Sequence, residues 1–168
     1  MRSGDDRIPP RDVRPDALPI EWQVPDNWRR VDNPNRFRVA TFHAGDSAED
    51  EPVEVAVSSL RGEGGGLLPN LNRWRRQIGL APVNSPESVE SAVAFEGARR
   101  RGMMFDMTGA APADGPPRGM IVAVVRTPYR TWYVKMSGDA ARIAPHRDEM
   151  FAFAKSFRWR AGQAETPG

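Results

Sequence analysis

Cysteine is absent from the 168 residues of this chain. That absence excludes disulfide bonds, zinc sites built from thiolates, iron–sulfur clusters and cysteine nucleophiles. It does not indicate a compartment, because a domain with a core of ordinary size needs no disulfide in either redox environment. Lysine is also scarce. Only Lys135 and Lys155 are lysines among the 24 basic residues, so arginine carries nearly all of the positive charge.

Long hydrophobic runs are missing as well. No apolar run approaches the ~18 residues that a membrane helix needs, so we expect no transmembrane segment. The opening segment, MRSGDDRIPPRDVRPD, has no apolar region of the kind that defines a signal peptide. We therefore expect a cytoplasmic protein if the chain is complete as written. If a signal or membrane tether is missing from its N-terminus, we expect an exported one.

Recognisable catalytic and metal-binding motifs are lacking too. In the glycine-rich segment 62–66, Leu67 follows where a dinucleotide fingerprint needs glycine, and no Gly-Lys-Ser/Thr triplet marks a phosphate loop. The two histidines, His43 and His146, lack the ligand spacing of a known metal motif, and no G-x-S-x-G or H-E-x-x-H is present. We expect no enzyme, no cofactor and no metal site, unless catalytic residues come together only in the fold.

The charges are nearly balanced, with 22 acidic residues against 24 basic ones and a formal net charge of +2. Binding to nucleic acid requires a one-sided basic patch, with aromatic side chains free to stack on bases. Segments 73–76 and 99–101 are rich in arginine, but Trp74 belongs to the apolar side of a predicted helix. We therefore expect no binding to nucleic acid.

Three segments differ in composition. Residues 1–18 are rich in proline, aspartate and arginine and carry almost nothing to bury, which is typical of a disordered arm. Residues 161–168, AGQAETPG, are expected to form a disordered tail. Residues 19–160 have the size of one ordinary domain, and we predict a single domain there.

Hydrophobic periodicity predicts an α+β fold inside that domain. Segments 67–80 and 145–157 have apolar residues at helical spacing, and Gly79 and Pro82 end the first helix. Alternating residues predict strands at 20–24, 36–43, 53–60, 103–108 and 130–137, and residues 120–126 are apolar on both faces, as a central strand should be. Residues 89–96 fit a strand or a loop. Short turns join the late strands, so we expect an antiparallel sheet with helices packed on it.

A polar line runs beside the apolar stripe of the helix predicted at 67–80. Asn70, Arg73 and Gln77 occupy positions i, i+3 and i+7 of one face, and Asn72 lies next to Arg73. A solvated polar face is the simpler interpretation. The alternative is a recognition surface, because the arginine fork binds carboxylates by two parallel hydrogen bonds.

Two charged residues lie in the middle of predicted strands. Asp106 and Lys135 each take the side of the strand opposite an apolar row. If the two strands are neighbours, these charges can form a pair. Such a half-buried pair is commonly structural, but it can also orient a binding group.

Several segments together resemble a family of bacterial proteins of unknown function. The most specific parts are the pattern Asn72-Arg73-Trp74-x-x-Gln77-x-Gly79 and the segment Trp132–Met136. The remaining similarity lies in the opening tryptophans, the glycine-rich run before the first helix and the terminal helix, namely Trp22, Pro25, Trp28, GGGLLPNLNRWRRQIGL, TWYVKMSGD, Phe151, Phe153 and Ser156. The resemblance extends from about Leu18 to Trp159.

Many members of that family are predicted lipoproteins or secreted proteins, and their domain is similar to the PsbP-like fold, which Mog-type proteins and DcrB share. The resemblance implies an antiparallel sheet flanked by helices in an α/β/α sandwich. The family has no established catalytic residues to assign to this chain. The resemblance implies a role as a binding or accessory module. It also implies a location in the cell envelope or outside the cell.

The leading hypothesis is a non-catalytic binding or accessory domain of the cell envelope that contacts an unidentified protein partner. In that hypothesis Arg73 takes an acidic group of the partner, and Asp106 and Lys135 orient the surface. The predicted binding patch consists of Asn70, Asn72, Arg73, Gln77, Asp106 and Lys135.

Two alternatives remain open. A chaperone-like groove for apolar segments requires exposed methionines, and the candidates are Met103, Met104, Met107 and Met120. These methionines are also ordinary core-filling residues. A binder of a small ligand, or an unrecognised enzyme, requires a concave pocket with two or more titratable groups of shifted pKa.

Overall fold

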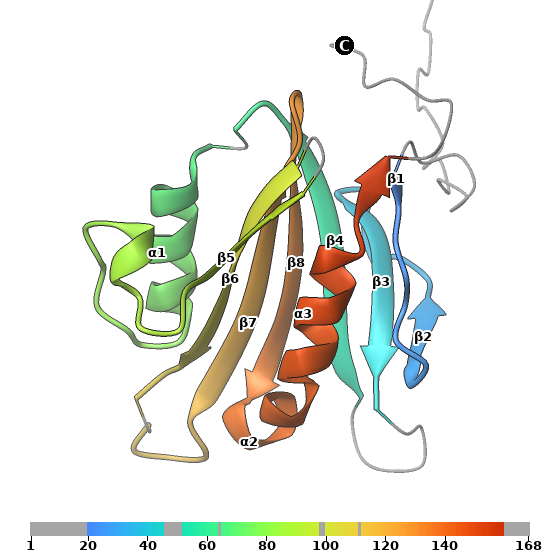
Figure 1. Cartoon of the computed structure of the whole chain (residues 1–168). Coiled ribbons are helices and arrows are strands. Elements are labelled where there is room, and N and C mark those ends of the chain that lie inside the picture. Colours follow the sequence, from blue (N-terminus) through green and yellow to red (C-terminus); the bar gives the residue numbers. More distant parts are fainter. Residues whose placement is uncertain (1–19, 46–51, 64, 98–99, 111, 160–168) are drawn as a thin grey trace, which may run out of the picture.

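The computed structural model describes residues 20–45, 52–63, 65–97, 100–110 and 112–159. The arm predicted at 1–18, the tail predicted at 161–168 and the two end residues of the domain predicted at 19–160 lie outside this part of the chain. Seven antiparallel strands form the main sheet in the order β2-β3-β4-β8-β7-β6-β5, and helices lie on both of its faces (Figure 1). The predicted α+β class and antiparallel sheet are therefore confirmed.

The strands of the main sheet are β2 (Trp28–Val31), β3 (Arg38–Ala44), β4 (Val53–Arg61), β5 (Val93–Gly97), β6 (Arg100–Thr108), β7 (Arg118–Arg126) and β8 (Arg130–Asp139). A separate pair joins β1 (Ile20–Glu21) to β9 (Arg158–Trp159). The helices are α1 (Leu67–Gln77), α2 (Ala140–Ile143) and α3 (Arg147–Lys155), with short 3-10 turns at Pro86–Ser88 and Ala144–His146. None of the described helices has the length and apolar character needed to cross a membrane.

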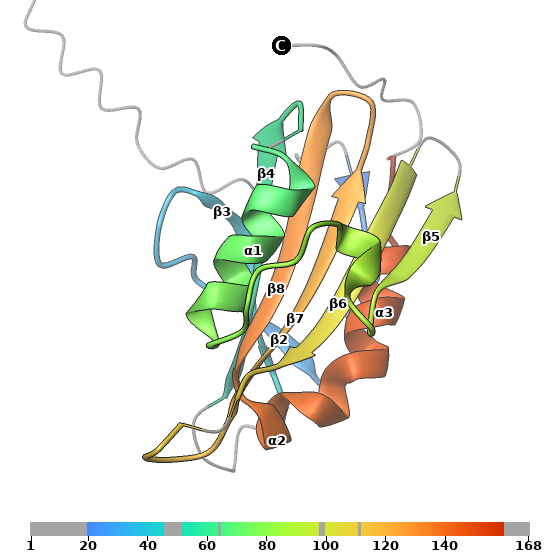
Figure 2. The ribbon, with the colours of Figure 1, turned by 90° about the vertical axis from the view of Figure 1, so that its left-hand side faces the viewer.

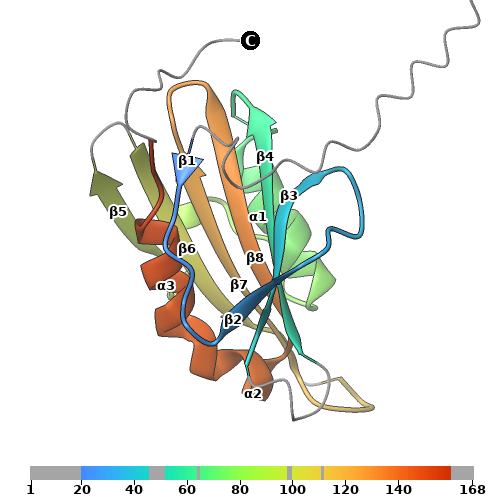
Figure 3. The same cartoon turned by 90° about the vertical axis from the view of Figure 1, so that its right-hand side faces the viewer.

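The face of the sheet that carries α2 and α3 holds the larger part of the core (Figure 3). Alternate residues of each strand point to this face, and nearly every residue of the central strand β7 is buried. Aromatic rings fill the space between the sheet and α3. Phe153 packs edge-to-face against Trp28 with ring centres 5.2 Å apart and against Phe42 at 5.6 Å. These contacts fix α3 to β2 and β3.

On the opposite face, α1 and the loop after it cover β6, β7 and β8 (Figure 2). The helix begins after Gly66, whose φ of 87° is one that glycine adopts without strain. Its apolar side, Leu71, Trp74 and Ile78, is buried against these three strands. No residue of β3 or β4 belongs to this core cluster among the described residues. The outer row of β4, which consists of Glu54, Ala56, Ser58 and Leu60, therefore stays open beside α1.

Two predictions near the start of the domain were wrong in detail. The strand expected at 20–24 is limited to β1, and the sequence did not indicate β2, which forms because Trp28 is buried in the aromatic cluster under α3. In β3, a register shift between Arg38 and Ala40 breaks the expected alternation. As a result Val39 and Ala40 both contact the same core, and Phe37 is 72% exposed.

The end of the chain also differs from the prediction. The helix expected at 145–157 begins as a 3-10 turn that contains Pro145 and continues as α3, and the sequence did not indicate the short helix α2 that precedes it. The undecided segment 89–96 forms most of β5, an edge strand that pairs only with β6. Arg100 at the start of β6 donates hydrogen bonds to the backbone carbonyls of Lys155 and Phe157, and so fixes the end of α3 to the sheet.

Candidate functional site

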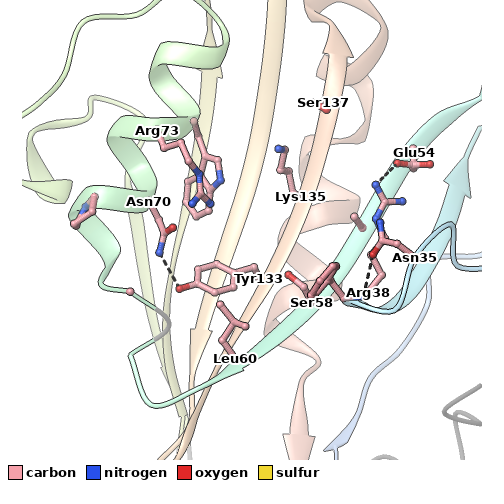
Figure 4. Close-up of a pocket in the computed structure, with 15 residues that line it drawn as sticks. Asn35, Arg38, Glu54, Ser58, Leu60, Asn70, Arg73, Tyr133, Lys135 and Ser137 are labelled. Carbon is pink, nitrogen blue, oxygen red and sulfur yellow. Dashed lines mark hydrogen bonds and ion pairs between the residues drawn. The ribbon is translucent and has the colours of Figure 1, made fainter. Parts of the chain in front are cut away.

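A trough of about 590 Å³ lies on the α1 face of the sheet, between α1 and strands β3, β4 and β8. Its floor is the outer row of β4 together with Tyr133, Lys135 and Ser137 of β8. One wall is α1, and the other is formed by the start of β3 and the residues before it (Figure 4). The volume falls within the range of ligand-binding pockets.

Strand pairing explains why these side chains share one face. β4 and β8 are antiparallel neighbours, with Ala56 opposite Lys135 and Ser58 opposite Tyr133. Residues opposite each other in a pair point to the same face, and every second residue follows them. Because Tyr133 packs under α1, Lys135 and Ser137 must also point to the α1 side.

Positive charge dominates the trough. Its lining includes the cations Arg38, Arg73 and Lys135, but only one carboxylate, that of Glu54. Nη2 of Arg38 lies 2.8 Å from Oε1 of Glu54. Nη1 of the same guanidinium is buried and has no hydrogen-bond partner among the described residues. Neither Arg73 nor Lys135 forms an ion pair within the described part of the chain.

This environment shifts the pKa values of two groups on the floor. Burial lowers the pKa of the Lys135 ammonium, and the nearby charges of Arg73 and Arg38 lower it further. Burial raises the pKa of the Tyr133 hydroxyl, although Arg73, Arg126 and the hydrogen bond from Asn70 oppose that shift. A bound anion would relieve the repulsion that acts on Lys135.

Hydrogen bonds hold the α1 wall against the floor. Nδ2 of Asn70 donates to the hydroxyl oxygen of Tyr133 over 3.2 Å and to the carbonyl of Gly66 over 2.8 Å. Nζ of Lys135 donates to Oε1 of Gln77 over 3.2 Å. The Trp74 and Tyr133 rings meet edge-to-face with their centres 5.7 Å apart. The polar line predicted on the helix therefore faces the floor of the trough at both of its ends.

Four of the six residues predicted as a binding patch come together here. Asn70, Arg73 and Lys135 line the trough, and Gln77 contacts it through Lys135. Asn72 lies elsewhere on α1. Its side chain accepts a hydrogen bond from the Val83 amide at 2.8 Å and donates one to the Val83 carbonyl at 3.0 Å. Asn72 thus holds the loop after α1, which is a structural role.

Asp106 and Lys135 do not form the pair that neighbouring strands would have allowed. Strand β7 lies between β6 and β8, so the two residues are not on neighbouring strands. Phe105 and Met107 point toward α1, so Asp106 points to the opposite face from Lys135. There its carboxylate lies 3.2 Å from Nε of Arg147 at the start of α3. The predicted single patch of six residues therefore does not form.

Several residues of the trough were not indicated by the sequence. Arg38, Glu54 and Tyr133 line it, as do two exposed apolar residues, Phe37 and Leu60. One signal pointed to part of this set: the strand predicted at 53–60 alternates valines with an outer row that begins at Glu54. Nothing in the sequence linked that row to the helix at 67–80.

A second polar cluster joins β2 to α3 outside the trough. The carboxylate of Glu149 accepts hydrogen bonds from Trp28 and Asn27, each at 2.8 Å, and lies 2.7 Å from Nδ1 of His146. Burial alone would raise the pKa of Glu149, but the hydrogen bonds from His146, Trp28 and Asn27 outweigh it and hold that pKa below its usual value. No group of three or more potential metal ligands occurs within the described ranges.

The methionines do not form a groove. Met104, Met107 and Met120 are each no more than 3% exposed, and Met103 packs partly buried beside α1. Their burial removes the observation on which the chaperone-like alternative depends. The small-ligand alternative keeps its support, because the trough holds two titratable groups of shifted pKa.

Comparisons with known proteins identify the fold. No protein-family model and no curated sequence matches the chain. The solution structure of cyanobacterial PsbP (CyanoP) from Synechocystis sp. PCC 6803 is similar with a TM-score of 0.55 and 13% identity, over 84% of this chain and 87% of that one. The crystal structure of LpqN, involved in cell envelope biogenesis of Mycobacterium tuberculosis, is similar with a TM-score of 0.50 and 12% identity, over 82% of this chain and 81% of that one. The expected PsbP-like fold is therefore confirmed.

Proposed function

We propose that this chain is a non-catalytic binding and accessory domain of the cell envelope, which holds an acidic group of a protein partner in the trough. The observation that carries the proposal is the charge of the trough, where three cations meet a single carboxylate. Arg73 and Lys135 lack an ion pair among the described residues, and one buried nitrogen of Arg38 lacks a hydrogen bond. An anion fits such a site, because it offsets the repulsion among three neighbouring cations that have a single carboxylate between them.

The non-catalytic part of the proposal rests on the residues of the site. The lining contains serines, but no histidine is among the described lining residues, and the Lys135 ammonium is hydrogen-bonded to Gln77 and not to a serine. A nucleophile without an adjacent base is weak. The location rests on similarity of fold: LpqN is involved in cell envelope biogenesis, and we carry that setting to this chain as part of the proposal.

Fluorescence anisotropy with a labelled peptide tests this function. One peptide alternates glutamate with serine, and its control replaces each glutamate with glutamine. We expect the acidic peptide to bind and the glutamine control not to bind. The affinity for the acidic peptide should fall as salt is added. Arg73→Ala and Lys135→Met should each weaken that binding about tenfold or more, which is about 1.4 kcal/mol or more.

Arg76→Ala is the matched control, because Arg76 is exposed on the same helix but does not line the trough. It should leave the affinity nearly unchanged. If Arg76→Ala weakens binding as much as Arg73→Ala, the peptide is attracted by overall charge and the proposed site is wrong. Thermal melting of every variant must show that the fold is retained.

A second candidate function is the binding of a small anionic molecule. The shifted pKa values of Lys135 and Tyr133 favour it, because small-ligand sites commonly perturb titratable groups. Native mass spectrometry of the protein purified from its own cells tests this candidate. A bound small anion that the Lys135→Met variant loses would favour it over the peptide.

A further inference from the structure

This inference rests on the proposed function, because it concerns the same trough. The trough has an apolar end as well as a cationic one. Four large apolar side chains are well exposed in the described residues, and two of them, Phe37 at 72% and Leu60 at 49%, line it. Exposed apolar side chains beside a pocket commonly mark the place where a partner packs. A purely ionic ligand would leave both of them uncovered.

Strand register gives the distance between the cationic end and the apolar end of the trough. Lys135 lies opposite Ala56, and Leu60 is four residues further along β4. At a rise of ~3.3 Å per residue, the backbone positions beside Lys135 and at Leu60 are about 13 Å apart. Phe37 precedes Arg38, which pairs with Ser58, so Phe37 lies toward the Leu60 end. Figure 4 shows Leu60 near Tyr133, and Glu54 with Lys135 and Ser137 at the opposite end.

The cations gather away from Leu60. Gln77 contacts Lys135 and Asn70 contacts Tyr133, so Arg73 lies between these two levels of α1. Arg38 begins near the apolar end, but its guanidinium reaches the carboxylate of Glu54. Between the two ends, Ser58 offers a polar contact. The trough therefore follows the strands, with charge at one end and apolar surface at the other.

We propose that the trough takes an extended peptide segment of the partner, in which a glutamate or aspartate meets Lys135 and Arg73 while a large apolar side chain about four residues away packs on Phe37 and Leu60. An extended chain has the same rise per residue as the strands beneath it, so a spacing of four residues covers the distance between the two ends. Charge complementarity fixes which end receives the acid.

Four labelled peptides of equal length test the spacing. The first has one glutamate and one phenylalanine four residues apart in an alanine–serine background, and the second has them adjacent. The third has the glutamate alone, and the fourth has the phenylalanine alone. We expect the spaced peptide to bind wild-type protein about tenfold more tightly than the glutamate-only peptide, because burial of a phenylalanine is worth about 1.5 kcal/mol or more. The adjacent peptide should gain little.

The double variant Phe37→Ser/Leu60→Ser should remove that advantage and leave the affinity for the glutamate-only peptide unchanged. Val24→Ser is the control, because Val24 is also an exposed apolar residue but lies outside the trough. Equal affinities for the spaced, adjacent and glutamate-only peptides would overturn this inference and leave the proposed function standing. Failure of every glutamate-containing peptide to bind would overturn both.

Discussion

The ammonium group of Lys135 donates a hydrogen bond to Oε1 of Gln77, and this contact joins the centre of the sheet to the last turn of α1. Its only described hydrogen-bond acceptor is thus a neutral amide, while Arg73 and Arg38 act on it as like charges. Arg73→Ala should therefore raise the pKa of Lys135 toward its ordinary value. NMR titration of 13C-labelled lysine can measure this, since the chain contains only one other lysine, Lys155, which serves as the internal reference.

The same shift has a consequence for stability. Burial and the two arginines make the folded state release the Lys135 proton more readily than the unfolded chain does, so unfolding takes up a proton in the interval between the two pKa values. The contribution of Lys135 to the free energy of unfolding should rise with pH across that interval.

Arg76→Ala is the control for the NMR titration and should leave the pKa of Lys135 unchanged. An equal effect of Arg76→Ala and Arg73→Ala on that pKa would contradict a local repulsion from Arg73.

Glu149 should make the protein sensitive to acid. Its folded pKa is held below the usual 4.5, so the stability it contributes is present above pH 4.5 and is lost as the pH falls through the folded pKa. Glu149→Gln should lower the free energy of unfolding at neutral pH by about 1.5–3 kcal/mol, the range for hydrogen bonds to a charged group. Urea denaturation at a series of pH values measures both effects.

Asp148→Asn is the control for Glu149, because the Asp148 side chain is 98% exposed. It should preserve the dependence of unfolding on acid that Glu149→Gln flattens. A Glu149→Gln variant with the wild-type dependence on pH would show that other carboxylates account for the acid sensitivity.

Gly109 should not tolerate a side chain. A Cβ at this position would collide with the carbonyl of Ile78 at the end of α1 and would lie 3.2 Å from the carbonyl oxygen of Arg118. Both obstacles are backbone atoms, which cannot rotate away. Gly109→Ala should destabilise the fold by about 1–3 kcal/mol, the usual cost of overpacking. At Gly138 a Cβ would meet only Ile143 at 3.6 Å, so Gly138→Ala is the matched control in thermal melting.

Asn72 should matter for stability and not for binding. Asn72→Ala removes both hydrogen bonds to the Val83 backbone and leaves two half-buried groups without those partners. We expect a loss of about 1–3 kcal/mol in the free energy of unfolding and no change in the affinity for the acidic peptide. If affinity fell while stability held, Asn72 would belong to the binding surface after all.

Local patterns predicted the parts of the fold that depend on neighbouring residues. The apolar stripe of α1 and the polar line beside it follow from helical spacing, which brings residues three and four positions apart onto one face. For that reason Asn70, Arg73 and Gln77 were placed together correctly. The central strand β7 was equally clear, because residues 120–126 are apolar on both sides and a strand buried on both faces requires that.

The remainder of the trough depends on pairing between distant segments. The sequence did not indicate that Arg38 and Glu54 would meet. Register pairs Arg38 with Ser58 and Glu54 with His43, and the long arginine side chain reaches along the sheet to the carboxylate. The error at Asp106 has a different cause. Alternation puts Met104 and Asp106 on one side of β6 and Phe105 and Met107 on the other. Both sides contain methionine, so the sequence does not indicate which side faces α1. Only the packed fold decides that.

The strand order has a consequence for how the chain folds. In the main sheet as described, every pair joins strands that are consecutive in sequence, except the pair of β4 with β8. Strands β2–β4 and β5–β7 can each form locally, but β8 must enter between them before the sheet is complete. Contacts between distant segments slow folding. We therefore expect the main sheet to form only after β8, residues 130–139, has been synthesised. Until then the edges of β4 and β7 stay unpaired and accessible to chaperones.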